Sequence, residues 1–207
     1  MRRVLKWLGI VFIVLIGIIV VAALAGTIIS NRRIATTYAL ADEALPLPTD
    51  AASLAEGQRL VTMRGCSDCH TPDFGGQVFI DDPMLGTIAT ANLTAGQGSA
   101  TAGYTVADWE RAIRHGVGPD GRGLLIMPSY EYAGLSDEQV AQMIAYLQTV
   151  PPVDRVAVEP VLKPVGRALF LAGQLPLLPA EMIDHTMGHV AAVPAAASAE
   201  YGAYLST

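Results

Sequence analysis

The chain has 207 residues and a formal net charge of −6 at pH 7, a length that provides for one small domain with some chain left over. The charge is uneven, because eight basic and 19 acidic residues follow Arg33, which gives that part of the chain a net charge of −11. So acidic a surface excludes nucleic acid as a partner. The acidity could serve solubility or could steer the protein toward a basic patch on a redox partner. We prefer solubility, since net charge alone does not identify a partner.

An uncharged apolar run extends over residues 8–29. As a helix, its 22 residues would cover about 33 Å, which is enough to cross a bilayer. A cleaved signal peptide is the alternative, because Ala23-Leu24-Ala25 resembles a cleavage site, but the run is longer than a typical signal core. The sequence therefore predicts a transmembrane anchor over residues 1–33, which contacts the membrane through residues 8–29.

A linker and a first helix are predicted next. Two prolines make part of residues 34–52 stiff and extended, which indicates a tether or a strand that wraps the domain. The pattern from Ser53 to Glu56 is a capping box, so we expect a short helix from there to about Arg64. Gly65 ends this helix directly before a pair of cysteines.

The middle of the chain is predicted to alternate loops with helices. Residues 71–104 are rich in Gly, Thr, Asp and Ala with little periodicity, and we expect a long irregular loop of the kind that wraps a cofactor. A second capping pattern opens a helix over residues 105–115. A glycine-rich loop follows at 116–130, and an amphipathic third helix begins at Ser136 and ends before the prolines at 151–152.

Residues 153–207 are predicted to form an irregular, proline-rich extension. Its apolar stretch over residues 168–178 is too short and too interrupted to span a membrane. We expect this stretch to pack on its own domain, on a partner subunit or on the bilayer surface. The predicted division of the chain is thus an anchor, a linker, a domain over residues 53–152 and this extension.

The two cysteines of the chain, Cys66 and Cys69, stand in the sequence Cys-Ser-Asp-Cys-His, which ends at His70. The pattern C-x-x-C-H is the attachment signature of c-type haem. The spacing has a physical reason, because the two thiols bond the two vinyl groups on one edge of the porphyrin. The adjacent His70 is then held beneath the iron as its axial ligand. We therefore predict one covalently bound haem c.

Three other interpretations of the cysteine pair are weaker. A thioredoxin-like redox pair needs a βαβ context, for which the sequence shows no pattern. A zinc site needs about four ligands, and no second cysteine pair completes one. A disulfide between residues three apart would be strained. Since c-type haem is attached on the outer side of the energy-coupling membrane, we expect a single-pass inner-membrane protein with a cytoplasmic N-terminus and a periplasmic haem domain.

The second axial ligand is predicted among the seven methionines. Met127 follows the glycine-rich loop, precedes a proline and lies between two helices, so its loop can pass over the distal face of the haem. Met84, a histidine or an open position are the alternatives, and Met127 could also be only a buried apolar residue. We expect His185 and His189 to face solvent or a partner rather than hold a metal.

The order of these residues resembles the membrane-bound cytochrome c proteins related to the cytochrome subunits of periplasmic alcohol and aldehyde dehydrogenases. The resemblance covers residues 53–152. It implies a class I cytochrome c fold, all-α, with a few helices around one haem and with His70 and Met127 as axial ligands. It also implies that Trp109 packs near the haem and that Arg122 meets a propionate. Besides the haem motif, the matching segments are Glu56-Gly57, Asn92-Leu93-Thr94, Trp109 with residues 112–114, Gly116-Val117, Asp120-Gly121-Arg122, Met127-Pro128 and Ala145-Tyr146-Leu147.

The function that follows from these features is single-electron transfer in a respiratory or photosynthetic chain. We expect an electron-transfer subunit of a larger membrane complex, not itself an enzyme, with redox proteins and other subunits as partners. A haem enzyme or gas sensor with an open distal site is the alternative. A third possibility is that the anchor and the extension chiefly hold a larger complex together.

The proposed relatives usually carry more than one haem motif, whereas this chain has one. A weak internal repeat bears on that difference. Aligning Gly57 with Gly202 places Leu60 on Leu205 and Thr62 on Thr207. This alignment suggests a second haem module beyond the last residue, with the proline-rich stretch as connector; a chance match in an alanine-rich tail is the alternative.

Overall fold

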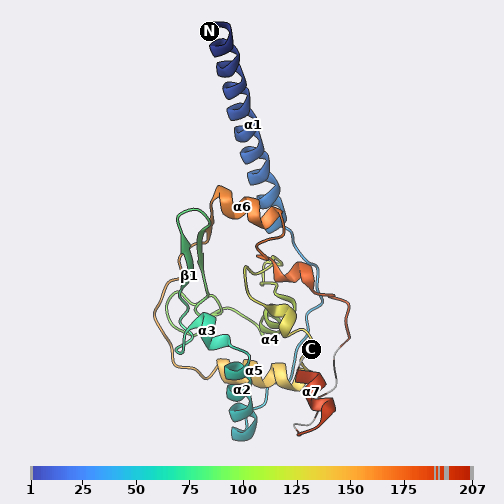
Figure 1. Ribbon diagram of the computed structural model, residues 1–207. Coiled ribbons are helices and arrows are strands. Elements are labelled where there is room, and N and C mark those ends of the chain that lie inside the picture. The colour runs from blue at the N-terminus through green and yellow to red at the C-terminus, as the bar shows by residue number, and fades with distance from the viewer. Residues whose placement is uncertain (1, 189, 191, 194–195, 206–207) are drawn as a thin grey trace.

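A single long helix projects from a domain that contains the rest of the chain (Figure 1). The structure is a computed structural model, and it describes residues 2–188, 190, 192–193 and 196–205. Helix α1 (Arg2–Ile34) is the one helix among these residues that is long and apolar enough to cross a membrane. Its apolar window is not buried against the domain, in agreement with the helix predicted over residues 8–29.

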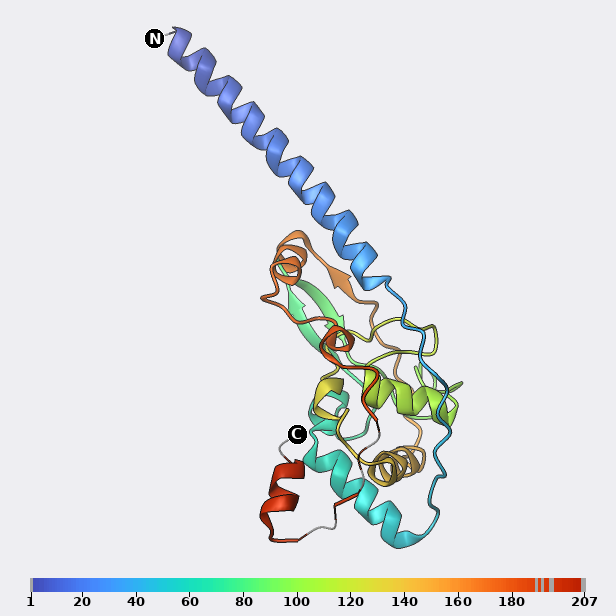
Figure 2. The ribbon, with the colours of Figure 1, turned by 90° about the vertical axis from the view of Figure 1, so that its right-hand side faces the viewer.

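The segment after α1 runs in an extended conformation along the side of the domain (Figure 2). The backbone N–H of Tyr38 donates to the carbonyl of Gly121 over 2.8 Å, and the side chain of Leu45 is buried in the domain core. These contacts fasten the segment to the domain. It ends at Asp50, the residue that caps the next helix.

Helix α2 (Ala51–Met63) begins two residues before the predicted start, so the predicted capping box at Ser53 is wrong. Asp50 is the N-cap, and its carboxylate accepts from the N–H of Ser53 over 2.9 Å. Glu56, which the capping box assigned to the helix start, forms an ion pair with Arg59 one turn later. An aspartate N-cap satisfies the same free N–H groups, which explains why the serine is not needed.

The prediction of an all-α domain is wrong at one place, although the structure is mostly helical. Within the expected loop, strands β1 (Val78–Asp82) and β2 (Gly86–Ala89) form an antiparallel hairpin. Strand β3 (Val161–Leu162) from the extension pairs antiparallel with β2, which gives the order β1-β2-β3. The strands are too short for their alternation to stand out in the sequence, and the third comes from a distant segment.

The second and third predicted helices are present. Helix α4 (Val106–Glu110) opens with the predicted capping box at Thr105 and continues into a π-helical turn, η1 (Arg111–His115). Helix α5 (Asp137–Leu147) has Ser136 as its N-cap. The remaining elements are α3 (Cys66–His70), the 3₁₀ turns η2 (Ser129–Glu131) and η3 (Pro179–Met182), α6 (Pro164–Leu171) and α7 (Ala199–Leu205).

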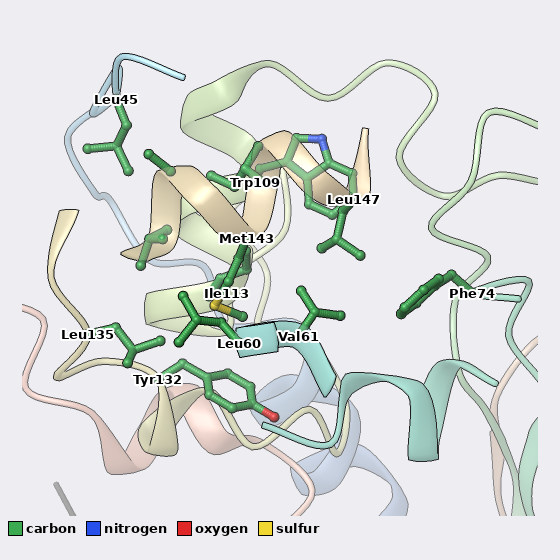
Figure 3. Close-up of a cluster of buried hydrophobic side chains, with 13 residues drawn as sticks. Leu45, Leu60, Val61, Phe74, Trp109, Ile113, Tyr132, Leu135, Met143 and Leu147 are labelled. Carbon is green, nitrogen blue, oxygen red and sulfur yellow. The ribbon is translucent and has the colours of Figure 1, made fainter. Parts of the chain in front are cut away.

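Two hydrophobic clusters stabilise the domain. In the larger one, Trp109 of α4 and Met143 and Leu147 of α5 lie above Leu60 and Val61 of α2 (Figure 3). The smaller cluster lies toward α1. It is formed by residues of β2, of the loop around residue 126 and of the extension. Its buried members are Ile88, Phe170, Leu177 and Leu178.

The extension is therefore part of the domain and not a free connector. Strand β3 extends the hairpin, α6 contributes Phe170 to the smaller cluster, and the hydroxyl of Tyr204 in α7 accepts from the N–H of Ser136 over 2.9 Å. The internal repeat was aligned as far as Thr207, which lies outside the described residues.

Replacing Gly57 with alanine should destabilise the domain, because the backbone of α5 lies directly against this residue of α2. A Cβ atom at position 57 would lie 2.1 Å from the carbonyl oxygen of Gln142 in α5. We expect a loss of about 2 kcal/mol in the free energy of unfolding, since overpacking exceeds the gain in helix propensity. Thermal unfolding of the haem-loaded protein measures this.

Gly202→Ala is the matched control, because Gly202 also lies in a helix and nothing is within 4 Å of its Cβ position. An unfolding temperature as high for Gly57→Ala as for this control would contradict the close packing of α2 on α5.

Candidate functional site

The cysteine motif forms a helix of its own, α3, which follows α2 after a sharp turn. Gly65 makes the turn in the left-handed conformation, with φ of +70°, which a residue with a side chain rarely adopts. Cys66 and Cys69 are half-buried and are not joined to each other. Burial raises the pKa of Cys66 to about 12 and also raises that of Cys69, so both are neutral thiols at pH 7. Neutral thiols do not suit a reactive redox pair or a thiolate metal site.

His70 ends α3, and its ring orientation is set by one hydrogen bond. Its Nδ1 lies 2.8 Å from the carbonyl oxygen of Ala91. A carbonyl only accepts, so Nδ1 carries the proton and the lone pair of Nε2 is available for a metal. Burial lowers the pKa of His70, and the bond to Ala91 opposes this shift only in part, so the ring is neutral at pH 7. This is the form in which histidine ligates haem iron.

Asn92 supports the carbonyl that orients His70. Its side chain is fully buried, and its Nδ2 donates to the carbonyls of Val153 (2.7 Å) and Arg155 (3.1 Å). Its Oδ1 accepts from the N–H of Thr94 over 2.9 Å. The residue thus ties the loop beside Ala91 to the start of the extension. The sequence marked Asn92 only as part of the family resemblance, because its partners lie about 60 residues away.

Two adjoining cavities lie beside the cysteine motif. The larger has a volume of about 360 Å³ and the smaller of about 120 Å³. Cys66, His70 and Met127 line both of them. The structure brings all six predicted site residues to these cavities, with Cys69 and Arg122 on the larger and Trp109 on the smaller.

Met127 is held in the loop between η1 and η2 from both sides. The N–H of the preceding Ile126 donates to the carbonyl of Leu177 over 2.8 Å, and Ile126 has a left-handed φ of +62°. On the other side, the hydroxyl of Ser129 donates to the carbonyl of Ala112 over 2.9 Å. Met84, the alternative ligand, lies in the β1–β2 turn, is 61% exposed and lines neither cavity.

Two aromatic residues and one arginine complete the walls. Trp109 is buried and packs edge-to-face against Tyr104, with ring centroids 5.7 Å apart. Tyr132, which the sequence analysis missed, lines both cavities and donates its hydroxyl to the carbonyl of Arg64 over 3.0 Å. Arg122 is exposed at the edge of the larger cavity, and its Nε lies 3.7 Å from Oδ2 of Asp120.

The donor set fits a covalently bound haem. Two neutral thiols, a histidine whose Nε2 is available and a thioether share a cavity whose other walls are mainly apolar. Ile34 at the end of α1 and Pro160 in the extension also line the larger cavity. Neither could be found from the sequence, because both are far from the motif along the chain.

The expectation for His185 is wrong, because this residue packs within its own chain. Its Nδ1 lies 3.0 Å from Nδ1 of His115, and the ring of Tyr38 meets it edge-on with centroids 5.0 Å apart. His189, which was paired with it in the sequence, lies outside the described residues. Within the described part of the chain, no group of three or more His, Cys, Asp or Glu residues could hold a metal ion.

Comparison with known proteins agrees with this geometry. Residues 54–151 match the family model for cytochrome c. The chain is 35% identical over 130 residues to the fructose dehydrogenase cytochrome subunit of Gluconobacter japonicus, covering 58% of this chain and 26% of that protein. It is 32% identical over 110 residues to the alcohol dehydrogenase (quinone) cytochrome c subunit of Gluconobacter oxydans. This match covers 50% of this chain and 23% of that protein.

A third relative, from Cereibacter sphaeroides, carries the name diheme cytochrome c-type. It is 32% identical over 130 residues, which cover 58% of this chain and 44% of that protein. The chain thus spans between about a quarter and less than half of the length of these curated relatives. The predicted resemblance to cytochrome c subunits of dehydrogenases is confirmed, and residues 54–151 are the part that matches the cytochrome c family model.

Replacing Asn92 with alanine should destabilise the domain, because the buried amide loses its hydrogen bonds with the carbonyls of Val153 and Arg155 and with the N–H of Thr94. We expect a loss of roughly 2 to 4 kcal/mol in the free energy of unfolding, measured by chemical denaturation of the haem-loaded protein. Gln97→Ala is the control, since Gln97 lies in the same loop with an exposed side chain. Equal stability of the two variants would contradict the supporting role of Asn92.

Proposed function

We propose, on the premise that residues 54–151 form a cytochrome c domain, that this protein carries single electrons by means of one covalently bound haem c. Bound in these cavities, the haem supplies a one-electron iron couple. One observation supports the proposal above others: Cys66, His70 and Met127 line the same two adjoining cavities.

Each site residue has a separate role in this proposal. Cys66 and Cys69 would attach the group through thioether bonds, and His70 would ligate the iron through Nε2. Met127 would be the second axial ligand, and a thioether in that position raises the reduction potential relative to other ligand sets. Trp109 would pack beside the group, and Arg122 at the cavity edge would meet a propionate.

Met127 also favours electron transfer over catalysis at the iron. A bound sulfur fills the position that a peroxidase or gas sensor leaves open for its substrate. The loop that carries Met127 is fixed by hydrogen bonds at Ile126 and Ser129, so the ligand would be held in place in both redox states. A haem enzyme or gas sensor remains the alternative function.

We further propose that the protein is a single-pass inner-membrane subunit of a larger redox complex. Helix α1 would be the anchor, with a cytoplasmic N-terminus and the haem domain on the periplasmic side. The relatives named above are cytochrome subunits of fructose and alcohol dehydrogenases, which supports a dehydrogenase or another membrane subunit as the electron donor. The haem domain would extend over residues 53–152, after the anchor at 1–33 and the linker at 34–52.

Replacing Met127 with alanine should open the sixth coordination position. We expect the haem to stay covalently attached, the reduction potential to fall, and the reduced protein to bind carbon monoxide rapidly, because the proposed sulfur ligand is gone. Absorption spectra of the reduced protein with and without carbon monoxide, together with a redox titration, measure this.

Met84→Ala is the matched control for this experiment, because Met84 is exposed in the hairpin turn. It should leave the spectrum, the potential and the carbon monoxide response unchanged. Rapid carbon monoxide binding by the unaltered protein would instead support the haem enzyme or gas sensor. Loss of the ligand in Met84→Ala, with no change in Met127→Ala, would exchange the two assignments.

The anchor proposal predicts how the protein leaves membranes. Because α1 presents an apolar surface long enough to cross the bilayer, high salt and alkaline washing should leave the protein in the membrane fraction, and detergent should release it. Sedimentation followed by haem staining of the pellet and supernatant measures this. Release by salt alone would show that the attachment is peripheral and that α1 does not span the membrane.

A further inference from the structure

Several polar and aromatic contacts join α1 to the domain. Arg167 of α6 donates from Nη1 to the hydroxyl of Ser30 over 2.5 Å and to Oδ1 of Asn31 over 2.6 Å. The guanidinium of Arg33 lies 4.4 Å from the centre of the Phe170 ring and forms an ion pair with Glu181. With Ser30 fully buried, these contacts fix α6 against the last turns of α1.

This junction places part of α6 at the depth of the apolar run. The Cδ1 atom of Leu171 lies 3.7 Å from the Cβ position of Gly26, which belongs to the run over residues 8–29. At the helical rise, Gly26 lies about 4.5 Å before the end of that run. An apolar run of this length fills the hydrocarbon core of a bilayer, so the C-terminal end of α6 lies at the boundary of that core.

The surface beside this junction is apolar and exposed. Met84 in the hairpin turn is 61% exposed, Val161 in β3 is 52% exposed and Val165 in α6 is 38% exposed. We call these three residues the proximal patch. The turn and the helix are in contact, because Lys163 Nζ donates to the carbonyl of Pro83 over 3.1 Å. Figure 1 shows both at the end of the domain from which α1 projects.

The charged residues around the patch are of both signs, and exposed Asp81 lies in the same row of the sheet as Val161. Asp82 at the hairpin turn accepts from the N–H groups of Met84 and Leu85 over 2.7 and 2.8 Å, so its carboxylate already has hydrogen-bond partners. Lys163 is exposed and contributes a positive charge, which phospholipid headgroups attract. Exposed apolar side chains next to a cation are typical of segments that lie in the interface of a bilayer.

We propose that the proximal patch lies in the interfacial layer of the same bilayer that α1 crosses, so that the domain rests on the lipid surface. The inference builds on the anchor of the proposed function and adds a second, monotopic contact. The lipid surface is the occupant because α6 packs on α1 at Gly26, and the patch lies at the end of the domain from which α1 projects (Figure 1). The domain is thereby held in one orientation, since α1 and the patch together provide two separate points of attachment.

Spin labelling of the haem-loaded protein in vesicles tests the proposal. A nitroxide on Val165→Cys, in phosphatidylcholine vesicles containing phosphatidylglycerol, should be relaxed several-fold more by oxygen, which concentrates in lipid, than by a water-soluble nickel chelate. Met84→Cys is a second site in the patch and should behave alike. Ala55→Cys is the control, because Ala55 is exposed on α2 at the opposite end of the domain (Figure 1). The unaltered protein, whose cysteines hold the haem, measures background labelling.

The possible results separate this inference from the anchor. One result would overturn the patch alone. In this case the protein floats with the vesicles, but the labels at 165 and 84 are relaxed by the nickel chelate as strongly as the label at 55. The anchor would then still hold. Labels shielded from both reagents would show that a second protein molecule covers the patch, and would also overturn it. Protein that does not float with the vesicles would overturn the anchor and the inference together.

Discussion

The hydrogen bond between His70 Nδ1 and the Ala91 carbonyl is the interaction on which the site depends. It fixes the tautomer and the plane of the ring, and so decides which nitrogen can reach a metal. The carbonyl is held in turn by the neighbouring Asn92, whose amide donates to the backbone at Val153 and Arg155. A local motif of five residues therefore acquires its geometry from a segment that enters the domain 60 residues later.

The same region leaves space inside the core of the domain. The larger hydrophobic cluster is built on α2, α4 and α5, and the smaller on β2, α6 and the residues around 177. The larger cavity is lined by members of both clusters, whereas only the larger cluster contributes to the lining of the smaller cavity. A large apolar group attached to the chain would supply the missing contacts, which would make attachment a contribution to folding as well as to redox chemistry.

What the sequence predicts here is local, and what it does not predict is long-range. The capping box at Thr105 and the cap at Ser136 are signals within a few residues, and the structure contains both of them. The sequence did not predict the hairpin, because its two strands are short and the strand that extends it to a sheet comes from the distant extension. Asn92 and Tyr132 could not be assigned roles, since their partners lie far away along the chain.

The apolar stretch over residues 168–178 shows how one segment can serve two surfaces. Its inward side chains, Phe170, Leu177 and Leu178, are buried in the smaller cluster, whose partly buried members Leu125 and Ile126 line the larger cavity. Its other contacts hold the end of α1, whose last residue, Ile34, lines the larger cavity itself. Ile34 follows the end of the apolar run by five residues, or about 7.5 Å of helix. If α1 spans a bilayer, the cavity edge must therefore lie close to the membrane surface, where a partner embedded in the same membrane could approach it.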